Sequence, residues 1–235
     1  MKIKLLRGIG VLIILIGVVF LLNKPIKNYS IAHTGDKYGI DKLDRKELKK
    51  NETAKATFDF EQVKPLDIAS VASAQLQQLS GKELPVIASI AIPSVHIRLP
   101  IFKGLSNENL LYGAGTVSEE QKMGKGNYSL ASHRSDQPTL LFTPIENMNK
   151  GDLIYLTDLE NVYVYQTVSV KKVSPTSVEV LDYQEGTTPI VTLLTCGDLY
   201  ARSRIVVQGT LSETIPLADI SDEIAEAFEL PIQSY

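Results

Sequence analysis

The chain has 235 residues, which is enough for one sizeable domain and an additional segment. Apolar residues make up 44% of the chain and charged residues 22%, and the formal net charge is −3. No strong positive field therefore points to nucleic acid as a partner. The single cysteine, Cys196, excludes an intramolecular disulfide and any zinc site that needs two thiolates.

A long apolar run near the N-terminus predicts a membrane anchor. Three cations, Lys2, Lys4 and Arg7, lie at the start of this run, which we place at residues 5–22. As a helix it is about 27 Å long, close to the ~30 Å hydrocarbon core of a bilayer. A cleaved signal peptide is the alternative, but its apolar region is shorter and ends in a small-x-small site, which does not follow here. The cations place residues 1–4 in the cytoplasm and the residues after the anchor outside the cytoplasmic membrane.

The next segment, residues 23–80, is polar, with alternating charge and few β-branched runs. It predicts an extracytoplasmic stalk with short helices at 43–50 and 68–79, which we expect to pack on the edge of the following domain. Structural cysteines outside the cytoplasm are usually paired. The unpaired Cys196 therefore indicates a working thiol.

Residues 81–235 form the predicted catalytic domain, in which short β-type runs alternate with turn signals from Pro85 onward. About eight strands without a βαβ rhythm predict an all-β fold with short helices, a closed barrel rich in antiparallel pairs. A short helix at 221–230 is expected at the end, capped by Ser221. The runs expected to form strands are "VIASIAIPSVHIRLPIF", which holds two, "LLYGAGTV", "NYSLASH", "DLIYLTD", "VYVYQTVSVKKV", "TPIVTLLTC" and "SRIVVQGTL".

Cys196 ends one predicted strand, and Arg204 opens the next. If these strands pair as neighbours, residues 197–203 join them, and the thiol and a guanidinium lie side by side at one end of the sheet. A cation there stabilises a thiolate and can hold an oxyanion or a substrate carbonyl. Arg202 is a rival for this role, because alternation places it on the same face as Arg204 if both are in the strand.

Three histidines are present, and none lies at metal-ligand spacing from another. His133 closes "NYSLASHR" at a predicted strand end, where a histidine can serve as acid or base beside a cysteine. His96 alternates with apolar neighbours and is interpreted as a strand-surface residue. His33 lies in the predicted stalk and is not a candidate.

These positions together resemble the class A sortases, membrane-anchored cysteine transpeptidases of Gram-positive bacteria. The family signature is a T-L-x-T-C strand end, here "TLLTC" at 192–196, with a histidine after "LAS" and an arginine opening the strand after the cysteine. The resemblance covers roughly residues 84–235, and the gap from cysteine to arginine and the "SDEIAEAF" tail are most similar to the streptococcal-type, housekeeping branch. It implies an eight-stranded sortase β-barrel with Cys196, His133 and Arg204 as catalytic residues.

The resemblance also implies a reaction. The Cys196 thiolate would cleave the Thr–Gly bond of a Leu-Pro-x-Thr-Gly signal near the C-terminus of a surface protein. An amine of the peptidoglycan precursor lipid II would then take up the acyl group, which anchors that protein to the cell wall. Thr195 is expected to serve the oxyanion through its hydroxyl or backbone N–H. The apolar groove for the signal is expected from Ala131, Pro175, Val178, Val180, Leu181 and Leu194.

No cofactor and no metal are expected. Some relatives bind calcium through acidic residues before the histidine strand, where this chain has "VSEEQKMGKGN". Glu119 and Glu120 are the only carboxylates there, and Lys122 and Lys125 stand beside them. Because calcium takes six or more oxygen ligands, we predict no calcium requirement.

Three alternatives stay open. An L,D-transpeptidase also uses a cysteine, a histidine and an arginine, but its S-H-G-C motif differs from the arrangement here. A non-catalytic, membrane-tethered binding domain would be indifferent to loss of Cys196. A pilin-polymerising sortase usually has an Asp-Pro-aromatic lid and a second span, which "FDFEQVKPLD" and the tail lack.

Overall fold

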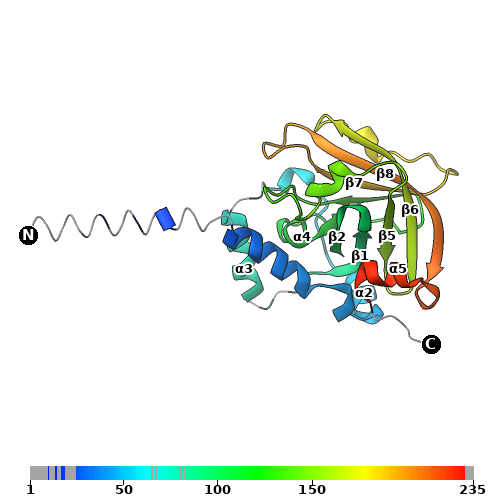
Figure 1. Cartoon of the computed structure of the whole chain (residues 1–235), viewed down its shortest axis with the longest axis horizontal. Helices are drawn as coiled ribbons and strands as arrows, with labels where there is room; N and C mark the ends of the chain where they lie inside the picture. The colour runs from blue at the N-terminus through cyan, green and yellow to red at the C-terminus, as the bar shows by residue number, and fades with distance from the viewer. Residues whose placement is uncertain are drawn as a thin grey trace, which may run out of the picture.

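A computed structural model of the chain describes residues 25–230 except 65, 67, 80 and 82, together with residues 10, 14, 17 and 18. Most of the anchor predicted at 5–22 lies outside the described residues. Within them, no helix combines the length and the apolar character that crossing a membrane requires. Figure 1 shows a barrel with helices along one side.

Eight strands close into a barrel in the order β1-β2-β3-β4-β7-β8-β6-β5. The β2–β3 and β4–β7 pairs are parallel, and the others are antiparallel. The prediction of an eight-stranded, antiparallel-rich barrel is therefore confirmed. The strands are β1 (Val86–Ile92), β2 (Ile97–Phe102), β3 (Ala114–Thr116), β4 (Asn127–Ala131), β5 (Leu153–Thr157), β6 (Asn161–Val173), β7 (Ile190–Cys196) and β8 (Arg204–Pro216).

Short helices decorate this barrel, as the sequence predicts. The expected helices at 43–50, 68–79 and 221–230 correspond to α2, α3 and α5. Ser221 caps α5, since its hydroxyl accepts a hydrogen bond from the Ile224 N–H. The α-helices are a helix that includes residues 25–37, α2 (Arg45–Asn51), α3 (Ile68–Leu79), α4 (Asn107–Tyr112) and α5 (Asp222–Phe228). The 3₁₀ helices are η1 (Ile40–Lys42), η2 (Phe60–Gln62), η3 (Pro93–Val95), η4 (Thr143–Asn147), η5 (Val178–Leu181) and η6 (Leu217–Asp219).

Two local predictions are wrong. The strand expected over "LLYGAGTV" loses its first three residues to α4, because Ser106 caps that helix by accepting from the Asn109 N–H. Only β3 is extended in this run. His96 is not on a strand: it ends η3 in the left-handed conformation (φ 52°), in the exposed turn between β1 and β2.

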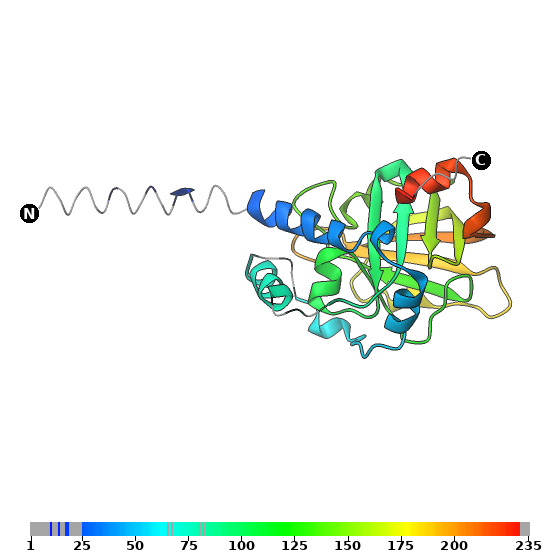
Figure 2. The ribbon, with the colours of Figure 1, turned by 90° about the horizontal axis from the view of Figure 1, so that it is seen from below.

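The segment before the barrel packs against it where the structure describes it. In Figure 2 the helix at 25–37 and α3 lie beside the barrel rather than apart from it. Ile31, Ile40 and Leu48 are buried in one apolar cluster with Phe102 of β2 and Phe228 of α5. The outer face of the sheet is thus covered by helices on this side.

Because helices cover the outer face of the sheet here, β1 is buried on both faces. All seven of its residues are buried, whereas a strand with one wet face buries every second residue. Ile90 belongs to the cluster inside the barrel, and Ala91 to the cluster beneath the helices.

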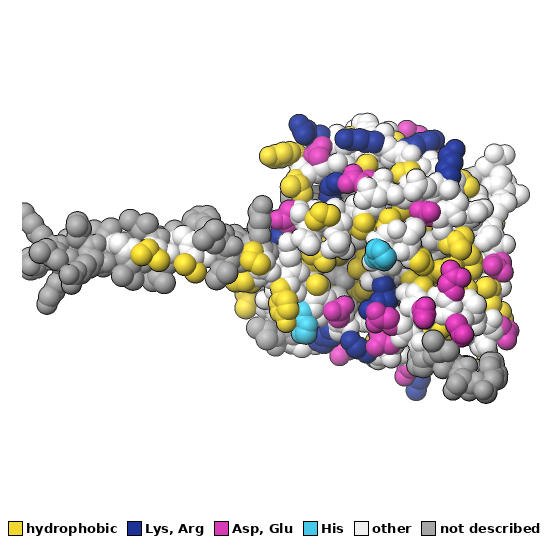
Figure 3. All heavy atoms as spheres, in the orientation of Figure 1, with side chains coloured by type: hydrophobic (Ala, Val, Ile, Leu, Met, Phe, Trp, Pro, Cys, Tyr) yellow, Lys and Arg dark blue, Asp and Glu magenta, His cyan; other side chains and the backbone are white. Residues whose placement is uncertain are grey.

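The surface charge is mixed. On the face drawn in Figure 3, acidic side chains gather at the lower right and basic side chains along the upper edge. This face therefore shows no continuous basic surface of the kind that binds a nucleic acid backbone.

Candidate active site

Cys196 and Arg204 are direct register partners at the loop end of the β7–β8 pair. The connecting loop, residues 197–203, is closed by a 2.8 Å hydrogen bond from the Gly197 N–H to the Ser203 carbonyl. Arg202 belongs to this loop and not to the strand. Its side chain is 74% exposed and pairs with Asp198 at 3.4 Å. The register thus places Arg204, and not its rival, opposite the cysteine.

One nitrogen of the Arg204 guanidinium forms hydrogen bonds within the protein. Its Nη1 donates to the carbonyl oxygens of Ala201 at 2.9 Å and Ser203 at 3.1 Å. These bonds hold both the loop and the guanidinium itself. The remaining donors stay available for a bound group, since Arg carries five N–H donors.

His133 reaches the same end of the barrel through the parallel β4–β7 pair. Ala131 is the register partner of Leu194, and parallel strands end at the same edge of a sheet. The Ser132 N–H continues the pairing by donating to the Leu194 carbonyl at 3.1 Å. One residue further on, His133 lies at the edge where β7 ends with Cys196.

Burial determines the protonation states of the two residues. It lowers the pKa of His133 from its ordinary 6.5 to about 4, since the imidazolium loses hydration. Burial also raises the pKa of the Cys196 thiol, although Arg204 and Arg134 act in the opposite direction and Asp198 adds to the rise. At neutral pH the resting pair is therefore a neutral imidazole and a neutral thiol.

One cavity of about 720 Å³ is lined by Cys196, His133 and Arg204. Its wall is mainly apolar, as expected of a site for a partly apolar ligand. The residues predicted from the sequence to bind substrate all line it: Ala131, Pro175, Val178, Val180, Leu181, Leu194 and Thr195. The structure thus brings every candidate site residue to one cavity.

The β6–β7 loop supplies part of the apolar wall, with Pro175, Val178, Val180 and Leu181. Two side chains of the barrel strands bind its η5 helix. Gln208 Nε2 of β8 donates to the Val180 carbonyl at 3.1 Å, and Asn127 Nδ2 of β4 donates to the Leu181 carbonyl at 3.0 Å. Val178 is exposed at the rim. The loop therefore has a fixed base and an apolar, solvent-facing edge.

Thr195 has a structural partner. Its hydroxyl donates to the Ser132 carbonyl at 2.9 Å, and the residue is buried. The hydroxyl proton is therefore used between two strand ends, which leaves it unavailable to an oxyanion in this arrangement.

One wall of the cavity is formed by residues that the sequence analysis did not identify. Lys27 of the first described helix pairs with Asp136 at 2.6 Å, in the loop that follows His133. Val63 packs on the apolar cluster that contains Ala131 and Leu194. Further lining residues that sequence reasoning missed are Phe60, Lys64, Leu66, Leu110, Arg134, Leu199 and Tyr200. No local pattern in the sequence links the segment before residue 67 to this site.

The acidic segment before β4 offers no metal centre. Glu119 lies 3.9 Å from Lys103 Nζ, and Lys122 and Lys125 face each other in an isolated bridge. Across the described part of the chain, no group of three His, Cys, Asp or Glu side chains is placed to hold a metal ion.

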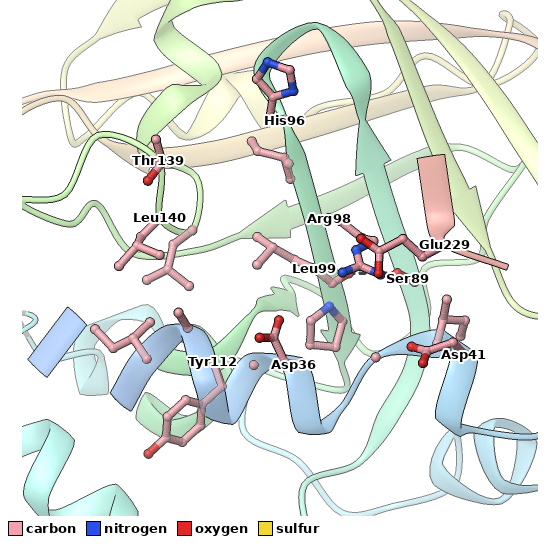
Figure 4. Close-up of a pocket in the computed structure, with 18 of the residues that line it drawn as sticks. Asp36, Asp41, Ser89, His96, Arg98, Leu99, Tyr112, Thr139, Leu140 and Glu229 are labelled. Carbon is pink, nitrogen blue, oxygen red and sulfur yellow. Dashed lines mark hydrogen bonds and ion pairs between the residues drawn. The ribbon is translucent and has the colours of Figure 1, made fainter. Parts of the chain in front are cut away.

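A second cavity, of about 360 Å³, lies between β2, the residues that follow the first helix, and the end of α5. Figure 4 shows the ion pair of Arg98 and Glu229 on one side and Asp36 on the helix opposite, with His96 at the far end. Cys196 does not line this cavity. It therefore lacks the nucleophile that the first cavity holds.

Comparison with known proteins identifies the family of the chain. Residues 90–212 match the Sortase domain family. Sortase A of Streptococcus agalactiae serotype III (strain NEM316) is 43% identical over 223 residues, which are 93% of this chain and 89% of that protein. Sortase A of Listeria monocytogenes serovar 1/2a (strain ATCC BAA-679 / EGD-e) is 37% identical over 88% of this chain and 92% of that protein. The solved structure of Listeria monocytogenes sortase A has a TM-score of 0.56 at 41% identity, and the match covers 61% of this chain and 96% of that chain.

The chain therefore belongs to the sortase family. The similarity to curated sortase A proteins over most of the chain makes it a transpeptidase of the sortase A type, which confirms the resemblance drawn from the sequence. The wall formed by Lys27, Phe60, Val63, Lys64 and Leu66 lies outside the region that matches the family.

Proposed function

We propose that this sortase cleaves the Thr–Gly bond of a C-terminal Leu-Pro-x-Thr-Gly signal and transfers the acyl group to an amine of lipid II. Surface proteins carrying the signal would thereby be anchored to the cell wall. The observation that carries the proposal is the convergence of Cys196, His133 and Arg204 on one apolar cavity. A single active-site thiol suits acyl transfer, because a thioester conserves acyl energy and no nucleotide is needed.

The reaction begins with proton transfer from the Cys196 thiol to His133. Both groups rest in their neutral forms, so the thiolate–imidazolium pair is a minority state at neutral pH. The thiolate sulfur attacks the threonine carbonyl carbon and gives a tetrahedral oxyanion. His133 then donates its proton to the glycine nitrogen as the C–N bond breaks, which leaves a thioester on Cys196.

In the second half of the reaction, these steps run in reverse with a different amine. An amino group of lipid II attacks the thioester carbonyl, and neutral His133 accepts the proton that this amine loses. The new amide forms as the C–S bond breaks, and the sulfur recovers a proton. His133 is unprotonated at neutral pH, so its ring nitrogen is available to accept this proton.

We assign to Arg204 the role of binding the substrate backbone and stabilising the oxyanion. It is the cation opposite Cys196 in the β7–β8 register, and two of its hydrogen bonds fix it to the loop before a substrate arrives. A preorganised donor of this kind stabilises developing charge without reorganisation during the reaction.

The Leu-Pro part of the signal is assigned to the wall between η5 and the strand ends. Val180 and Leu181 pack on the same apolar cluster as Ala131 and Leu194, so an apolar side chain entering there loses contact with water. The apolar run at 5–22 is proposed to tether the enzyme to the cytoplasmic membrane, close to a lipid-linked acceptor.

The test is turnover of a quenched Leu-Pro-x-Thr-Gly peptide with and without a primary amine acceptor, followed by mass spectrometry of the products. Cys196→Ala and Arg204→Ala are expected to reduce turnover at least ~1000-fold and ~100-fold. Arg202→Ala is the matched control and should retain most activity. A wild-type enzyme that gives no amide product with any amine, or an Arg202→Ala variant that fails as Arg204→Ala does, contradicts the proposal. A non-catalytic binding domain predicts no dependence on Cys196.

A further inference from the structure

A second arginine contacts the nucleophile's backbone. Arg134 directly follows His133, and its Nη1 donates to Glu146 Oε2 at 3.0 Å, while Nη2 donates to the other oxygen of that carboxylate. The same Nη1 lies 3.4 Å from the carbonyl oxygen of Cys196. The guanidinium thus spans from η4 to the end of β7.

This guanidinium is held in one orientation. A bidentate pair between a planar guanidinium and a carboxylate fixes direction as well as distance. The Arg134 side chain is only 17% exposed, so water screens the pair less than it screens a surface pair. Arg134 lines the cavity that holds the thiol.

The two arginines around Cys196 hold different parts of the chain. Arg204 donates to carbonyls of the loop after the cysteine, at Ala201 and Ser203. Arg134 donates to the carbonyl of the cysteine itself. Only Arg134 is adjacent in sequence to His133, and it therefore links the backbone carrying the base to the backbone carrying the nucleophile.

We propose that Arg134, oriented by Glu146, is a positioning residue that fixes Cys196 relative to His133 and places a second cation beside the thiol. The proposal rests on the transpeptidase function proposed above. Arg134 contacts the cysteine backbone, so the role assigned to it is exerted through Cys196.

The electrostatics of the site agree with this role. Burial dominates and raises the pKa of Cys196, and Arg134 is one of two cations that oppose the rise. The charged groups that act on the thiol are Arg204 from β8, Arg134 after β4 and Asp198 from the loop after β7. The neutral His133 and the charged Lys27, Lys64 and Asp136 line the same cavity. Loss of the Arg134 charge therefore makes the thiolate harder to form.

The test measures the rate of Cys196 alkylation by iodoacetamide as a function of pH, beside kcat/KM for the quenched peptide. Arg134→Gln is expected to move the alkylation midpoint up by roughly half a pH unit or more and to lower kcat/KM roughly tenfold. Arg134→Lys should restore the midpoint but not the full kcat/KM, because an ammonium cannot form the bidentate pair. Glu146→Gln should lower kcat/KM several-fold without raising the midpoint.

Arg202→Gln, at an exposed arginine near the same loop, is the matched control and should change neither quantity. An Arg134→Gln variant with the midpoint and kcat/KM of Arg202→Gln overturns the proposal, as does an Arg134→Lys variant whose midpoint stays with that of Arg134→Gln. Alkylation needs no peptide, so a shifted midpoint in an enzyme that does not turn over the peptide refutes the proposed substrate and leaves the positioning role of Arg134 supported. Urea unfolding of each variant establishes that the fold is retained.

Discussion

The hydroxyl of Thr195 donates a 2.9 Å hydrogen bond to the carbonyl oxygen of Ser132, 63 positions earlier in the chain. Each partner is the immediate neighbour of a proposed catalytic residue, Cys196 on one side and His133 on the other. The bond therefore joins the two strand ends at the position where the reaction needs them to be fixed. The hydroxyl of the threonine beside the nucleophile is therefore engaged within the barrel in this arrangement.

Replacing Thr195 with valine tests this link. Thr195→Val keeps the shape of the side chain but leaves the buried Ser132 carbonyl without this donor, which costs about 1–2 kcal/mol of unfolding free energy. We also expect kcat/KM for the quenched peptide to fall several-fold, since the cysteine and histidine are less firmly aligned. Urea unfolding and peptide turnover measure the two effects. Thr195→Ser keeps the hydroxyl and is the control; a Thr195→Val variant with wild-type stability and kcat/KM beside a Thr195→Ser variant that loses both would show that the methyl group, not the hydrogen bond, matters.

Acid should destabilise the protein through His133. The folded-state pKa is about 4, whereas an unfolded histidine titrates near 6.5. Between these values the unfolded state binds more protons, so stability is complete above about pH 6.5 and falls as the pH drops toward 4. The full difference corresponds to on the order of 3 kcal/mol.

Urea unfolding at a series of pH values between 7 and 4 measures this effect. Wild type should lose stability on acidification more steeply than His133→Gln, which cannot take up the proton. His96→Gln, at an exposed histidine, should keep the wild-type slope. Parallel stability curves for wild type and His133→Gln would contradict the burial argument.

The barrel strands could be predicted because their signals are local. In β7 a β-branched, apolar run ends at Cys196, and β8 opens after a loop of the right length for an antiparallel pair, so the pairing of these two strands, with a thiol and a guanidinium at one end, could be anticipated. The same reasoning could not choose between Arg202 and Arg204, because strand alternation gives both the same face. The choice depends on where β8 begins, and that is set by the Gly197–Ser203 contact across the loop.

The parts that could not be predicted depend on contacts between distant segments. Val63 lies between Phe60 and Leu66 in a short stretch of mixed polar and apolar residues, and this local pattern does not show that the stretch packs beside the β6–β7 loop. The Arg134–Glu146 pair depends on the position of η4 relative to β7. The start of "LLYGAGTV" was misassigned because a strand pattern and a short capped helix look alike over three apolar residues.

The segment before the barrel should contribute strongly to stability. Leu48 of α2 is fully buried, 0% exposed, in a cluster shared with the barrel. Leu48→Ala is therefore expected to cost about 2–5 kcal/mol of unfolding free energy. Leu76→Ala, on α3 at a leucine that is 68% exposed, should change it by less than about 0.5 kcal/mol. Similar stabilities for the two variants in urea would mean that α2 is dispensable for the fold.

The same segment should also affect recognition of the sorting signal. Val63 packs on the cluster that includes Val180 and Leu181 of the proposed groove. Two backbone contacts keep its segment in place: the Leu105 N–H donates to the Thr57 carbonyl at 2.7 Å, and the Lys64 N–H donates to Asn107 Oδ1 at 2.7 Å. The wall is therefore held independently of the Val63 side chain.

Val63→Ala should consequently weaken peptide binding without disturbing the chemistry. Removing two methyl groups from an apolar wall lowers binding by about 1–2 kcal/mol, which raises KM for the Leu-Pro-x-Thr-Gly peptide several-fold and leaves kcat nearly unchanged. Steady-state turnover over a range of peptide concentrations separates the two constants. The control is Val168→Ala, at an exposed valine of β6 that does not line the cavity. If kcat falls while KM stays constant, Val63 supports the catalytic residues instead of the substrate, and the groove ends at the β6–β7 loop.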